Sequence, residues 1–579
     1  MAMDRSWSIA AFAAAWLAFS AAGAAADAAA GGVLTHRLER RLSVAGPDER
    51  IAVVVSFDET SAASRTTAAG SMSRPVLRER VRERESFVRS SLAAYIANGR
   101  VSRIRSLWIV GAIALRGTPD AIRELTSIPG VERVLWDEPQ RVLIDPPPVS
   151  PAEALPPAAA AADTGWGVLK VGAPAAWQKG YRGQGVIVAV LDTGIDFTHP
   201  DLQNRIWTNP GEIPGNLVDD DGNGYVDDVH GYNFADTLSN PMDDHGHGTK
   251  VAGVICGDGT ADTLTGVAPE ATVMAVKVLA YDGDAQQADV WEGIQYAIDN
   301  GAKVMNLSIG WKQSAEPDRA MWRMACDNAL AAGVVMVAAS GNERDDGIPA
   351  PDNIRTPGDV PGPMTLPTPS GVVTSGGTDS DDWVAYYSSY GPVEWADVPP
   401  WFDHPYPPGL IKPDVVAPGL FINTTAWAGD PDFTGYYTGP SQHGTSMATP
   451  HVAGAVALLL SAKPWLTPFE VDSLLEATAL DIFAAGKDND SGSGRVQADS
   501  LLEAVASAVA DGRPAVPLLT VRQNYPNPFN PITTIRFDLA RRTGVRVEVF
   551  DISGRKVRTL ARREFGAGAH EAVWNGTDD

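Results

Sequence analysis

The stretch VLDTGIDFTHPDL (residues 190–202) closes an apolar run, Val186 to Leu191, with one carboxylate, Asp192, and a Thr-Gly turn. An unbroken apolar run of strand length predicts a strand that is buried on both faces, as in a parallel sheet covered by helices. The carboxyl ends of such strands carry the functional sites of open α/β sheets. An isolated Asp at a strand end is usually a turn former. Here we expect it to point into a cleft.

Similar apolar runs recur at 273–279, 304–309 and 334–339, and they alternate with helical stretches. This alternation is typical of an α/β fold with a parallel sheet between two helical layers. One helix is expected to begin at TPFE (467–470), where Thr caps, Pro takes the first helical position and Glu completes a capping box. Residues 164–510 therefore predict a three-layer α/β domain.

Three more segments place a polar residue at a junction between elements. His247 lies between glycines in HGHGTKVAGVI (245–255), at the start of a small-residue helix. Ser446 lies at the entry of a helix in GTSMATPHVAG (444–454), where the positive end of the helix lies beneath its hydroxyl. Asn342 follows a buried strand in VMVAASGNE (335–343), where its amide can be aimed at a developing charge.

Each of these residues taken alone has a plain structural interpretation, the His as a satisfied polar group and the Ser as an N-cap. Together they supply a nucleophile, a base, an orienting acid and an oxyanion donor, which is what acyl transfer requires. We therefore expect four distant parts of the chain to meet in one site, at Asp192, His247, Asn342 and Ser446.

In the order Asp, His, Asn, Ser, these segments closely resemble the subtilisin-like serine proteases, the subtilases. GVAPEATVMAVKVL (266–279) and KPDVVAPG (412–419) add to the resemblance, which covers residues 164–510. It implies that Ser446 attacks the peptide carbonyl, His247 moves the proton and Asp192 fixes the imidazole. It also implies an oxyanion site at Asn342 and the Ser446 N–H, and a wall of the specificity pocket at Ser308, Ile309 and Gly310.

The histidine segment offers two candidates, His245 and His247. The Gly-Thr-x-Val-Ala-Gly that follows favours His247 as the base. Lys250 stands where relatives usually carry a second His. It lies one helical turn after His247, at a distance from which it can shift the pKa of the base.

The segment DDDGNGYVDD (219–228) gathers carboxylates and an Asn around two glycines. Hard oxygen ligands at alternate positions suit Ca²⁺. The match to an EF-hand loop is partial, because His230 replaces the Glu of the last position. We expect a structural calcium loop, of the sort that many subtilases use, with a solvated acidic turn as the alternative. Its predicted ligands are Asp219, Asp221, Asn223 and Asp227.

The chain has 579 residues, 44% of them hydrophobic and 20% charged, and a formal net charge of −25. So negative a field repels phosphate, and we expect no nucleic-acid partner. Cys256 and Cys326 belong to no C-x-x-C motif and predict no disulfide framework. No stretch after the leader reaches the ~20 apolar residues of a membrane span, so no transmembrane span is expected in the mature protein.

Residues 1–26 combine one Arg, an Ala-rich apolar run and a small-residue end, which predict a secretory signal peptide. Residues 27–141 predict a small α+β domain with strands at 51–57, 107–115 and 131–135 and helices at 76–98 and 119–127. This domain resembles the inhibitory propeptide of subtilases. The resemblance implies a ferredoxin-like unit whose tail lies in the active cleft until it is cut.

The rest of the chain divides at two linkers. Residues 142–163 are rich in Pro and Ala and predict an extended linker, with the maturation cut expected between about Pro139 and Gly165. A second linker at 511–518 precedes residues 519–579, where VRVEVFDISGRKVRTL (545–560) alternates as in strands. This last segment resembles the immunoglobulin-like sorting and hook-capping modules of exported bacterial proteins, and we expect either that the module is incomplete or that the sequence is a fragment. It implies contact with a surface or a secretion machinery, and a mere spacer is the alternative.

The sequence therefore predicts a secreted serine endopeptidase that acts on protein or peptide substrates and is made as a self-inhibited precursor. The runner-up is a catalytically silent subtilase scaffold that serves as an extracellular binding module, and an adhesin acting through 519–579 is a third hypothesis. The intact set of four site residues favours the enzyme. Cleavage preference stays open, because it depends on how the loops at 347–371 and 393–409 fold.

Overall fold

The computed structural model describes residues 33–57, 74–144, 163–363, 370–399, 401–430, 435–510, 519–521, 532–539, 543–550, 556–566 and 568–577. The predicted signal peptide and the predicted linker segments 145–162 and 511–518 lie outside the described residues. The chain divides into two compact units. The first holds most of the chain up to Glu138, and the second holds Leu107–Val110 and everything from Pro139 onward.

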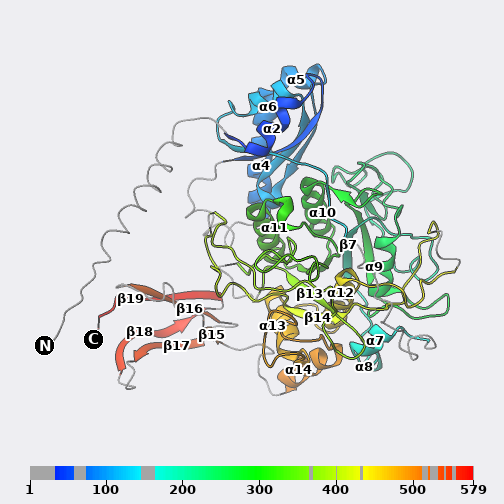
Figure 1. Ribbon diagram of the computed structural model, residues 1–579, viewed down its shortest axis with the longest axis vertical. Helices are drawn as coiled ribbons and strands as arrows, with labels where there is room; N and C mark the ends of the chain where they lie inside the picture. The colour runs from blue at the N-terminus through cyan, green and yellow to red at the C-terminus, as the bar shows by residue number, and fades with distance from the viewer. Residues whose placement is uncertain are drawn as a thin grey trace. The chain divides into compact units, whose positions relative to one another are not determined.

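The first unit is built on a five-stranded sheet with the order β1-β5-β2-β4-β3. The central strand β2 is antiparallel to both β4 and β5. The strands are Val33–Leu34 (β1), Ile51–Phe57 (β2), Val101–Leu107 (β3), Ala112–Gly117 (β4) and Val131–Trp136 (β5), and the helices are His36–Val44 (α2), Arg74–Ser91 (α4), Ala93–Ala97 (α5) and Pro119–Leu125 (α6) (Figure 1). This unit thus combines helices with a sheet that holds parallel and antiparallel pairs.

The single strand predicted at 107–115 is wrong. The chain ends β3 at Leu107, forms a 3-10 turn at Trp108–Val110 and reverses into β4. Gly111 has φ 63° and supplies the left-handed conformation of this reversal. The apolar run continues through the turn, so hydrophobic periodicity gave no sign of the break.

The second unit is organised around a seven-stranded sheet with the order β14-β13-β12-β11-β7-β9-β8. All neighbours in it are parallel. Because β9 lies on one side of β7 and β11 on the other, the connections change direction there, and ligand sites lie at such switch points. The strands are Ile187–Asp192 (β7), Gly231–Asn233 (β8), Thr272–Lys277 (β9), Val304–Leu307 (β11), Val335–Ala339 (β12), Val373–Thr378 (β13) and Val415–Pro418 (β14).

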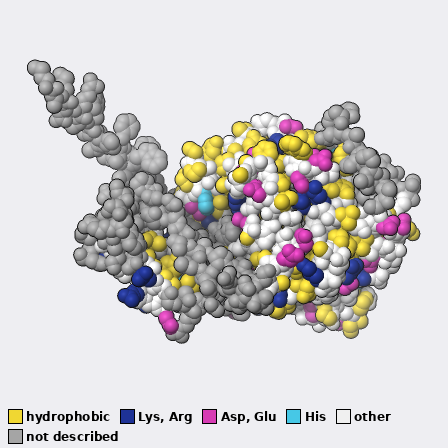
Figure 2. Space-filling view, turned by 90° about the horizontal axis from the view of Figure 1, so that it is seen from below, with side chains coloured by type: hydrophobic (Ala, Val, Ile, Leu, Met, Phe, Trp, Pro, Cys, Tyr) yellow, Lys and Arg dark blue, Asp and Glu magenta, His cyan; other side chains and the backbone are white. Residues whose placement is uncertain are grey.

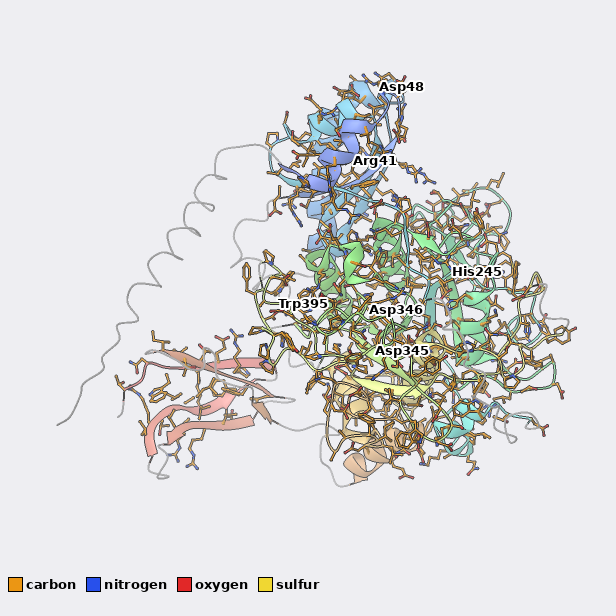
Figure 3. All side chains as sticks on the ribbon, viewed as in Figure 1. Arg41, Asp48, His245, Asp345, Asp346 and Trp395 are labelled. Carbon is orange, nitrogen blue, oxygen red and sulfur yellow. The ribbon has the colours of Figure 1, made fainter. Side chains whose placement is uncertain are left out.

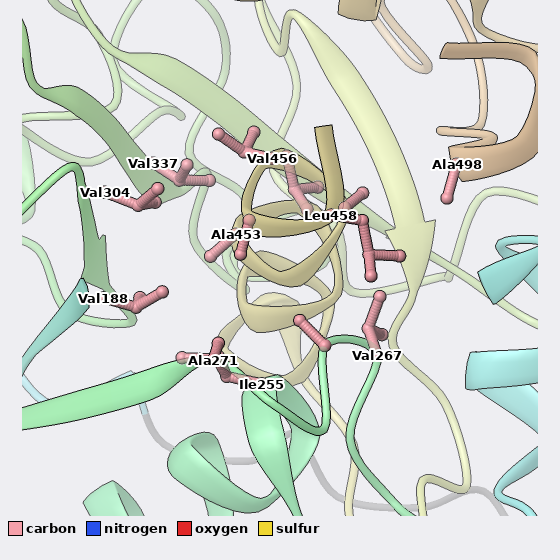
Figure 4. Packing of buried hydrophobic residues seen from close by; sticks show 14 of the residues in the cluster. Val188, Ile255, Val267, Ala271, Val304, Val337, Ala453, Val456, Leu458 and Ala498 are labelled. Carbon is pink, nitrogen blue, oxygen red and sulfur yellow. The ribbon is translucent and has the colours of Figure 1, made fainter. Parts of the chain in front are cut away.

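Helices cover this sheet on both faces. Alternate residues of the strands, among them Val188, Val304 and Val337, join one large apolar cluster with α9 (His247–Cys256) and α12 (Thr445–Ala462) (Figure 4). The residues between them face the other way. Gly293 of α10 (Gln287–Asp299) approaches so closely that a Cβ added there would lie 2.9 Å from the side chain of Val276. The predicted three-layer α/β architecture is confirmed.

The remaining helices of this unit complete the layers. α11 (Arg319–Ala331) contacts α10 and β12, whereas α13 (Pro468–Thr478) and α14 (Ala498–Ala510) contact each other. The predicted capping box is present, since Thr467 and Glu470 bond to each other's backbone at the start of α13. Two short helices, Trp166–Lys170 (α7) and Ala173–Gln178 (α8), precede the sheet.

One helix in the described part of the chain, α12, is long and apolar enough to cross a membrane. Its apolar window is 89% buried inside the protein, as expected for the core helix of a globular domain.

The C-terminal residues form only strands among those described, as predicted. β15 (Leu519–Val521), β16 (Thr533–Leu539) and β19 (Gly568–Trp574) make one antiparallel sheet, and β17 (Thr543–Phe550) pairs with β18 (Lys556–Phe565). Phe537, Leu539 and Phe565 are buried in a small core of their own. On the face of the molecule shown in Figure 2, acidic side chains lie scattered among Lys and Arg rather than gathered in one patch.

Candidate active site

Asp192 and His247 meet at the carboxyl end of the sheet. Asp192 is the last residue of β7, and His247 is the first residue of α9. The Nδ1 atom of His247 lies 2.8 Å from the Asp192 Oδ1, and the two residues are 8% and 0% exposed. A buried carboxylate accepts the Nδ1 proton, so the lone pair of the neutral ring lies on Nε2. Nε2 is buried and has no hydrogen-bond partner among the described residues.

Asn342 and Ser446 converge on one point. Asn342 follows β12, and Ser446 lies in the first turn of α12. A Cβ added to Gly444 would lie 3.1 Å from the Asn342 Nδ2 and 3.1 Å from the Ser446 Oγ. Gly444 has φ 132°, a conformation open to glycine, so both polar atoms face a space left by a missing side chain.

The orientation of the Asn342 amide is fixed by Thr445. The Thr445 N–H and hydroxyl both lie 3.0 Å from the Asn342 Oδ1. A backbone N–H can only donate, so this atom must be the amide oxygen, and the NH₂ group is the one turned toward Ser446. An amide donor held in this way can stabilise an oxyanion.

The hydroxyl of Ser446 makes no hydrogen bond to the imidazole in this geometry, since Nε2 of His247 lacks a partner. The structure therefore brings Asp192 to His247 and Asn342 to Ser446, and it leaves the two pairs unbonded to each other.

Ser308, Ile309 and Gly310 follow β11 and line an occupied groove. The Ser308 hydroxyl donates to the Ser446 carbonyl at 2.8 Å, which holds this segment beside the helix start. Ile309 forms an antiparallel bridge with Leu143, and the Gly310 N–H donates to the Val142 carbonyl at 3.0 Å. The predicted pocket wall thus lies against an extended piece of the same chain.

The opposite edge of the extended segment 140–144 is also hydrogen-bonded to the protein. Gln140–Arg141 (β6) is antiparallel to Asp284–Ala285 (β10), and the N–H groups of Val142 and Leu143 donate to the Gly283 carbonyl. Val142, Leu143 and Ile144 are 0%, 2% and 0% exposed. The prediction of an extended linker from residue 142 is therefore wrong for these three residues. Their apolar side chains are buried, and their backbone pairs with β10 and Gly283 on one side and with Ile309 and Gly310 on the other.

Two positioning groups were missed in the sequence. Asp243 accepts hydrogen bonds from the N–H groups of His245, Gly246 and Thr249 and from the Thr193 hydroxyl. It thereby caps α9 and ties it to the turn after Asp192. An Asp four residues before the candidate base was the available signal.

The second positioning group is Lys277, the last residue of β9. Its ammonium is 1% exposed and donates to the carbonyls of Thr193 and Leu279 and to Asp244. It therefore fixes the turn that carries Asp192. In the sequence, a lysine at the end of an apolar strand does not by itself indicate this positioning role.

His245 lies beside the start of α9 (Figure 3). Burial, and next the charge of His247, lower the pKa of His245. The bond to Asp192 is made by His247 and not by His245. Lys250 forms an ion pair with Asp430, whose carboxylate lies 3.3 Å from the Lys250 ammonium.

The acidic segment 219–228 brings together a set that differs from the predicted one. Glu212, Asp219 and Asp221 each present an oxygen, and these oxygens all lie within 4.8 Å of one another. Glu212 is 8% exposed, and its Oε2 has no hydrogen-bond partner. A buried carboxylate oxygen without a donor, next to two more carboxylates, fits a hard cation such as Ca²⁺.

The other two predicted ligands are placed differently. Asn223 donates to Asp221 and to Asp228 through its amide. Asp227 accepts N–H bonds from Gly215, Asn216 and Leu217, and it lies outside the carboxylate group. Asp227 has φ 52° and sits in a turn, which directs its side chain to the backbone of the preceding loop. Burial raises the pKa of Asp228 to about 6.

Two segments of the chain match known protein families. Residues 183–498 match the Subtilase family, and residues 523–569 match the secretion system C-terminal sorting domain. Subtilisin BL of Lederbergia lenta is 35% identical over 335 residues, which cover 58% of this chain and 97% of that protein. Subtilisin E of Bacillus subtilis (strain 168) is 33% identical over 315 residues, or 54% of this chain and 65% of that protein. The chain therefore belongs to the subtilase family of serine endopeptidases and, with its sorting domain, is a secreted or cell-surface protein.

Proposed function

We propose that this endopeptidase uses Ser446 as nucleophile, His247 as general base and acid, and Asp192 as the group that holds the imidazole. The observation that carries the proposal is the 2.8 Å contact between His247 Nδ1 and Asp192. It leaves the basic Nε2 buried and without a partner on the side away from the carboxylate. A base prepared in this way can accept the proton of an incoming alcohol.

The proposed reaction proceeds through an acyl-enzyme. The Ser446 Oγ bonds to the peptide carbonyl carbon while its proton passes to His247 Nε2, and the carbonyl oxygen becomes an oxyanion between Asn342 Nδ2 and the Ser446 N–H. When the tetrahedral species collapses, the C–N bond breaks and His247 gives its proton to the leaving amine. Water then repeats the sequence on the acyl ester and restores the serine.

Hydrolysis of a peptide substrate by matched serine variants tests this assignment. Ser446→Ala should abolish turnover, whereas Ser441→Ala should leave it unchanged, because the hydroxyl of the exposed Ser441 bonds only to the Thr438 carbonyl and the Gln442 amide among the described residues. Equal rates in the two variants would contradict the role of Ser446. Absence of activity in the unmodified, processed chain would instead favour the silent scaffold.

We infer in addition that the chain is made as a self-inhibited precursor. Residues Gln140–Ile144 lie as an antiparallel strand between β10 and the segment that carries Ile309. Peptide substrates bind to sheet edges in this way, by main-chain hydrogen bonds. This mode of binding supports a precursor whose own segment fills the groove until it is cleaved.

The register suggests which bond is cut. Since Leu143 pairs with Ile309 in an antiparallel bridge, Ile144 lies opposite Ser308, whose hydroxyl donates to the main chain of Ser446. Ile144 is thus the bound residue nearest the nucleophile, and the bond after it is the expected cut. Intact mass and N-terminal sequencing should find a mature chain that begins at Asp145. Processing of Ser446→Ala at the same rate and site would contradict self-cleavage.

We further propose that Glu212, Asp219 and Asp221 hold a structural Ca²⁺. The unpartnered buried oxygen of Glu212 supports this set. In thermal unfolding, Ca²⁺ should raise the midpoint of the unmodified chain over that in chelator, and Glu212→Gln should lose most of that increment. Asp227→Asn is the matched control, because it should lower the midpoint equally with and without Ca²⁺. A full increment in Glu212→Gln would overturn the assignment.

The sorting domain suggests a partner of another kind. We propose that residues 523–569 make contact with a secretion machinery. A chain lacking residues 519–579 should keep its peptidase activity and lose export in a host that carries the matching machinery. Unchanged export of the shortened chain would contradict this role.

A further inference from the structure

The space between the carboxyl ends of β11 and β12 is closed by a short segment around Arg355. The Arg355 N–H donates to the Ser340 carbonyl at 3.0 Å. Thr356 and Trp311 exchange two backbone hydrogen bonds, of 2.8 and 2.9 Å. The segment therefore runs beside both strand ends, directly behind Gly310 and Gly341.

The stem of Arg355 fills the room that these two glycines leave. A Cβ added to Gly310 would lie 2.9 Å from the Arg355 Cβ, and one added to Gly341 would lie 3.1 Å from the Arg355 Cγ. Arg355 is 5% exposed. Its stem is thus packed into the floor between the wall residues Ser308–Gly310 and the Asn342 turn, instead of extending into solvent as an arginine usually does.

The guanidinium is held by a partner that comes directly after the oxyanion donor. Its Nε and Nη2 donate to Glu343 Oε1 at 3.0 and 2.5 Å. Glu343 is 3% exposed, and its other oxygen accepts from the Ser389 hydroxyl at 3.2 Å. A buried ion pair with this many hydrogen bonds is a fixed part of the site, since loss of one partner leaves an uncompensated charge.

The third nitrogen of the guanidinium, Nη1, lies against the segment 142–144 that occupies the groove. Nη1 donates to the Gly310 carbonyl at 2.9 Å and makes longer contacts to the carbonyls of Val142, at 3.4 Å, and Leu143, at 3.5 Å. These are the two residues that precede Ile144. Arg355 therefore borders both the groove wall and the main chain that occupies the groove.

We propose that Arg355 is a specificity-determining residue that limits the size of the side chain accepted before the cleaved bond. This inference rests on the proposed function. The Arg355 stem fills the room between the wall residue Gly310 and the turn at Gly341, so we expect a short aliphatic residue such as Ile144 to fit there and a large aromatic one not to fit. The family resemblance alone left the cleavage preference open.

The test compares cleavage of two peptide series that differ only in the residue before the scissile bond, Ile or Phe. The unmodified enzyme should favour Ile by at least about tenfold in kcat/KM, the range that differences of a few methylene groups produce in a rigid pocket. The double variant Arg355→Ala with Glu343→Gln opens the floor without leaving a buried charge, and it should reduce or invert that ratio by about tenfold or more.

Two matched variants separate the stem from its charge. Glu343→Gln alone keeps an amide oxygen as acceptor for the guanidinium, which also donates to the Gly310 carbonyl, so we expect the stem to stay in place at some cost in stability and the preference for Ile to be kept. Arg344→Ala removes a neighbouring arginine that pairs with Asp490 instead, and it should also leave the ratio unchanged. A change of preference in either variant equal to that of the double variant would overturn the inference.

Each outcome is decisive when active sites are counted with a fluorophosphonate probe. If the enzyme is labelled and prefers Phe, or if the double variant is labelled and keeps the original ratio, the inference about Arg355 fails while the proposed function stands. If the unmodified, processed enzyme takes no label, the proposed function fails and the inference with it. The preference of the unmodified enzyme is informative even if the double variant does not fold.

Discussion

Thr445 holds the carboxamide of Asn342 by two hydrogen bonds, from its N–H and its hydroxyl, each 3.0 Å long. The residue next to the nucleophile thus orients the oxyanion donor. Because Thr445 is fully buried at the first turn of α12, this orientation is set before any substrate binds. A donor that needs no reorganisation is the most effective kind in charge stabilisation.

Replacing the oxyanion donor should lower turnover and leave substrate affinity almost unchanged. Asn342→Leu keeps the volume of the side chain and removes the NH₂ group. We expect kcat to fall by about 10²–10³, the typical cost of losing one such donor, with little change in KM. Steady-state kinetics on one peptide substrate measure both constants. A rise in KM at constant kcat would place Asn342 in ground-state binding instead.

Adding one methyl group beside the nucleophile should block the site. In Gly444→Ala the new Cβ would lie 3.1 Å from both Asn342 Nδ2 and Ser446 Oγ, at a φ of 132° that strains any L residue. We expect a loss of at least about 10² in kcat/KM, as for a lost oxyanion donor. Gly435→Ala is the control, since nothing lies within 4 Å of its added Cβ. Full activity of Gly444→Ala would refute the placement of the oxyanion.

Neutralising the orienting acid should cost more than removing the oxyanion donor. Asp192→Asn keeps the size of the side chain, but its amide can donate to Nδ1 and favour the wrong tautomer of His247. We expect kcat to fall by about 10⁴. Asp196→Asn is the control, because Asp196 caps the next turn through Thr198 and does not contact His247. Kinetics near neutral pH measure the difference, and equal effects of both changes would contradict the role of Asp192.

Acid should destabilise the domain through His451 on α12. Burial lowers the pKa of His451 from 6.5 to about 4. Between these two pH values the unfolded chain therefore binds a proton at His451 and the folded protein does not. The stabilisation is complete above pH 6.5 and is lost as the pH falls toward 4, by about 3 kcal/mol in all.

Denaturant unfolding of the inactive Ser446→Ala chain at pH 7 and pH 4.5 measures this loss. His451→Gln removes the titrating group, and its unfolding free energy should differ less between the two pH values. His443→Gln is the matched replacement, because the His443 ring is only half-buried and its Nδ1 lies 2.9 Å from the Ser441 carbonyl oxygen of the same turn. An unchanged pH dependence in His451→Gln would show that other groups dominate.

Most of the sheet and the first half of the site could be predicted from the sequence. Runs such as Val304–Leu307 are almost entirely apolar because both faces of β11 are covered, and this pattern can be recognised in the sequence alone. The approach of Asp192 to His247 follows from the placement of each at an element end. The contacts themselves could not be predicted, because they join residues far apart in the chain.

Three features escaped prediction for physical reasons. Gly111 reverses the chain inside an apolar run, where hydrophobicity stays constant through the turn. Val142–Ile144 resemble the start of a linker in sequence, yet they bind as a strand because free edges are available on both sides. Glu212 replaces Asp227 in the carboxylate group because loop closure, and not spacing along the chain, decides which carboxylates meet.

The most direct test of the central claim is to label the processed enzyme with a fluorophosphonate and map the modified peptide by mass spectrometry. The account predicts a single adduct on the peptide that contains Ser446. It also predicts that His247→Ala removes most of the labelling and that Ser441→Ala has none of that effect. A processed, folded enzyme that takes no label, or takes it on a serine other than Ser446, would contradict the account.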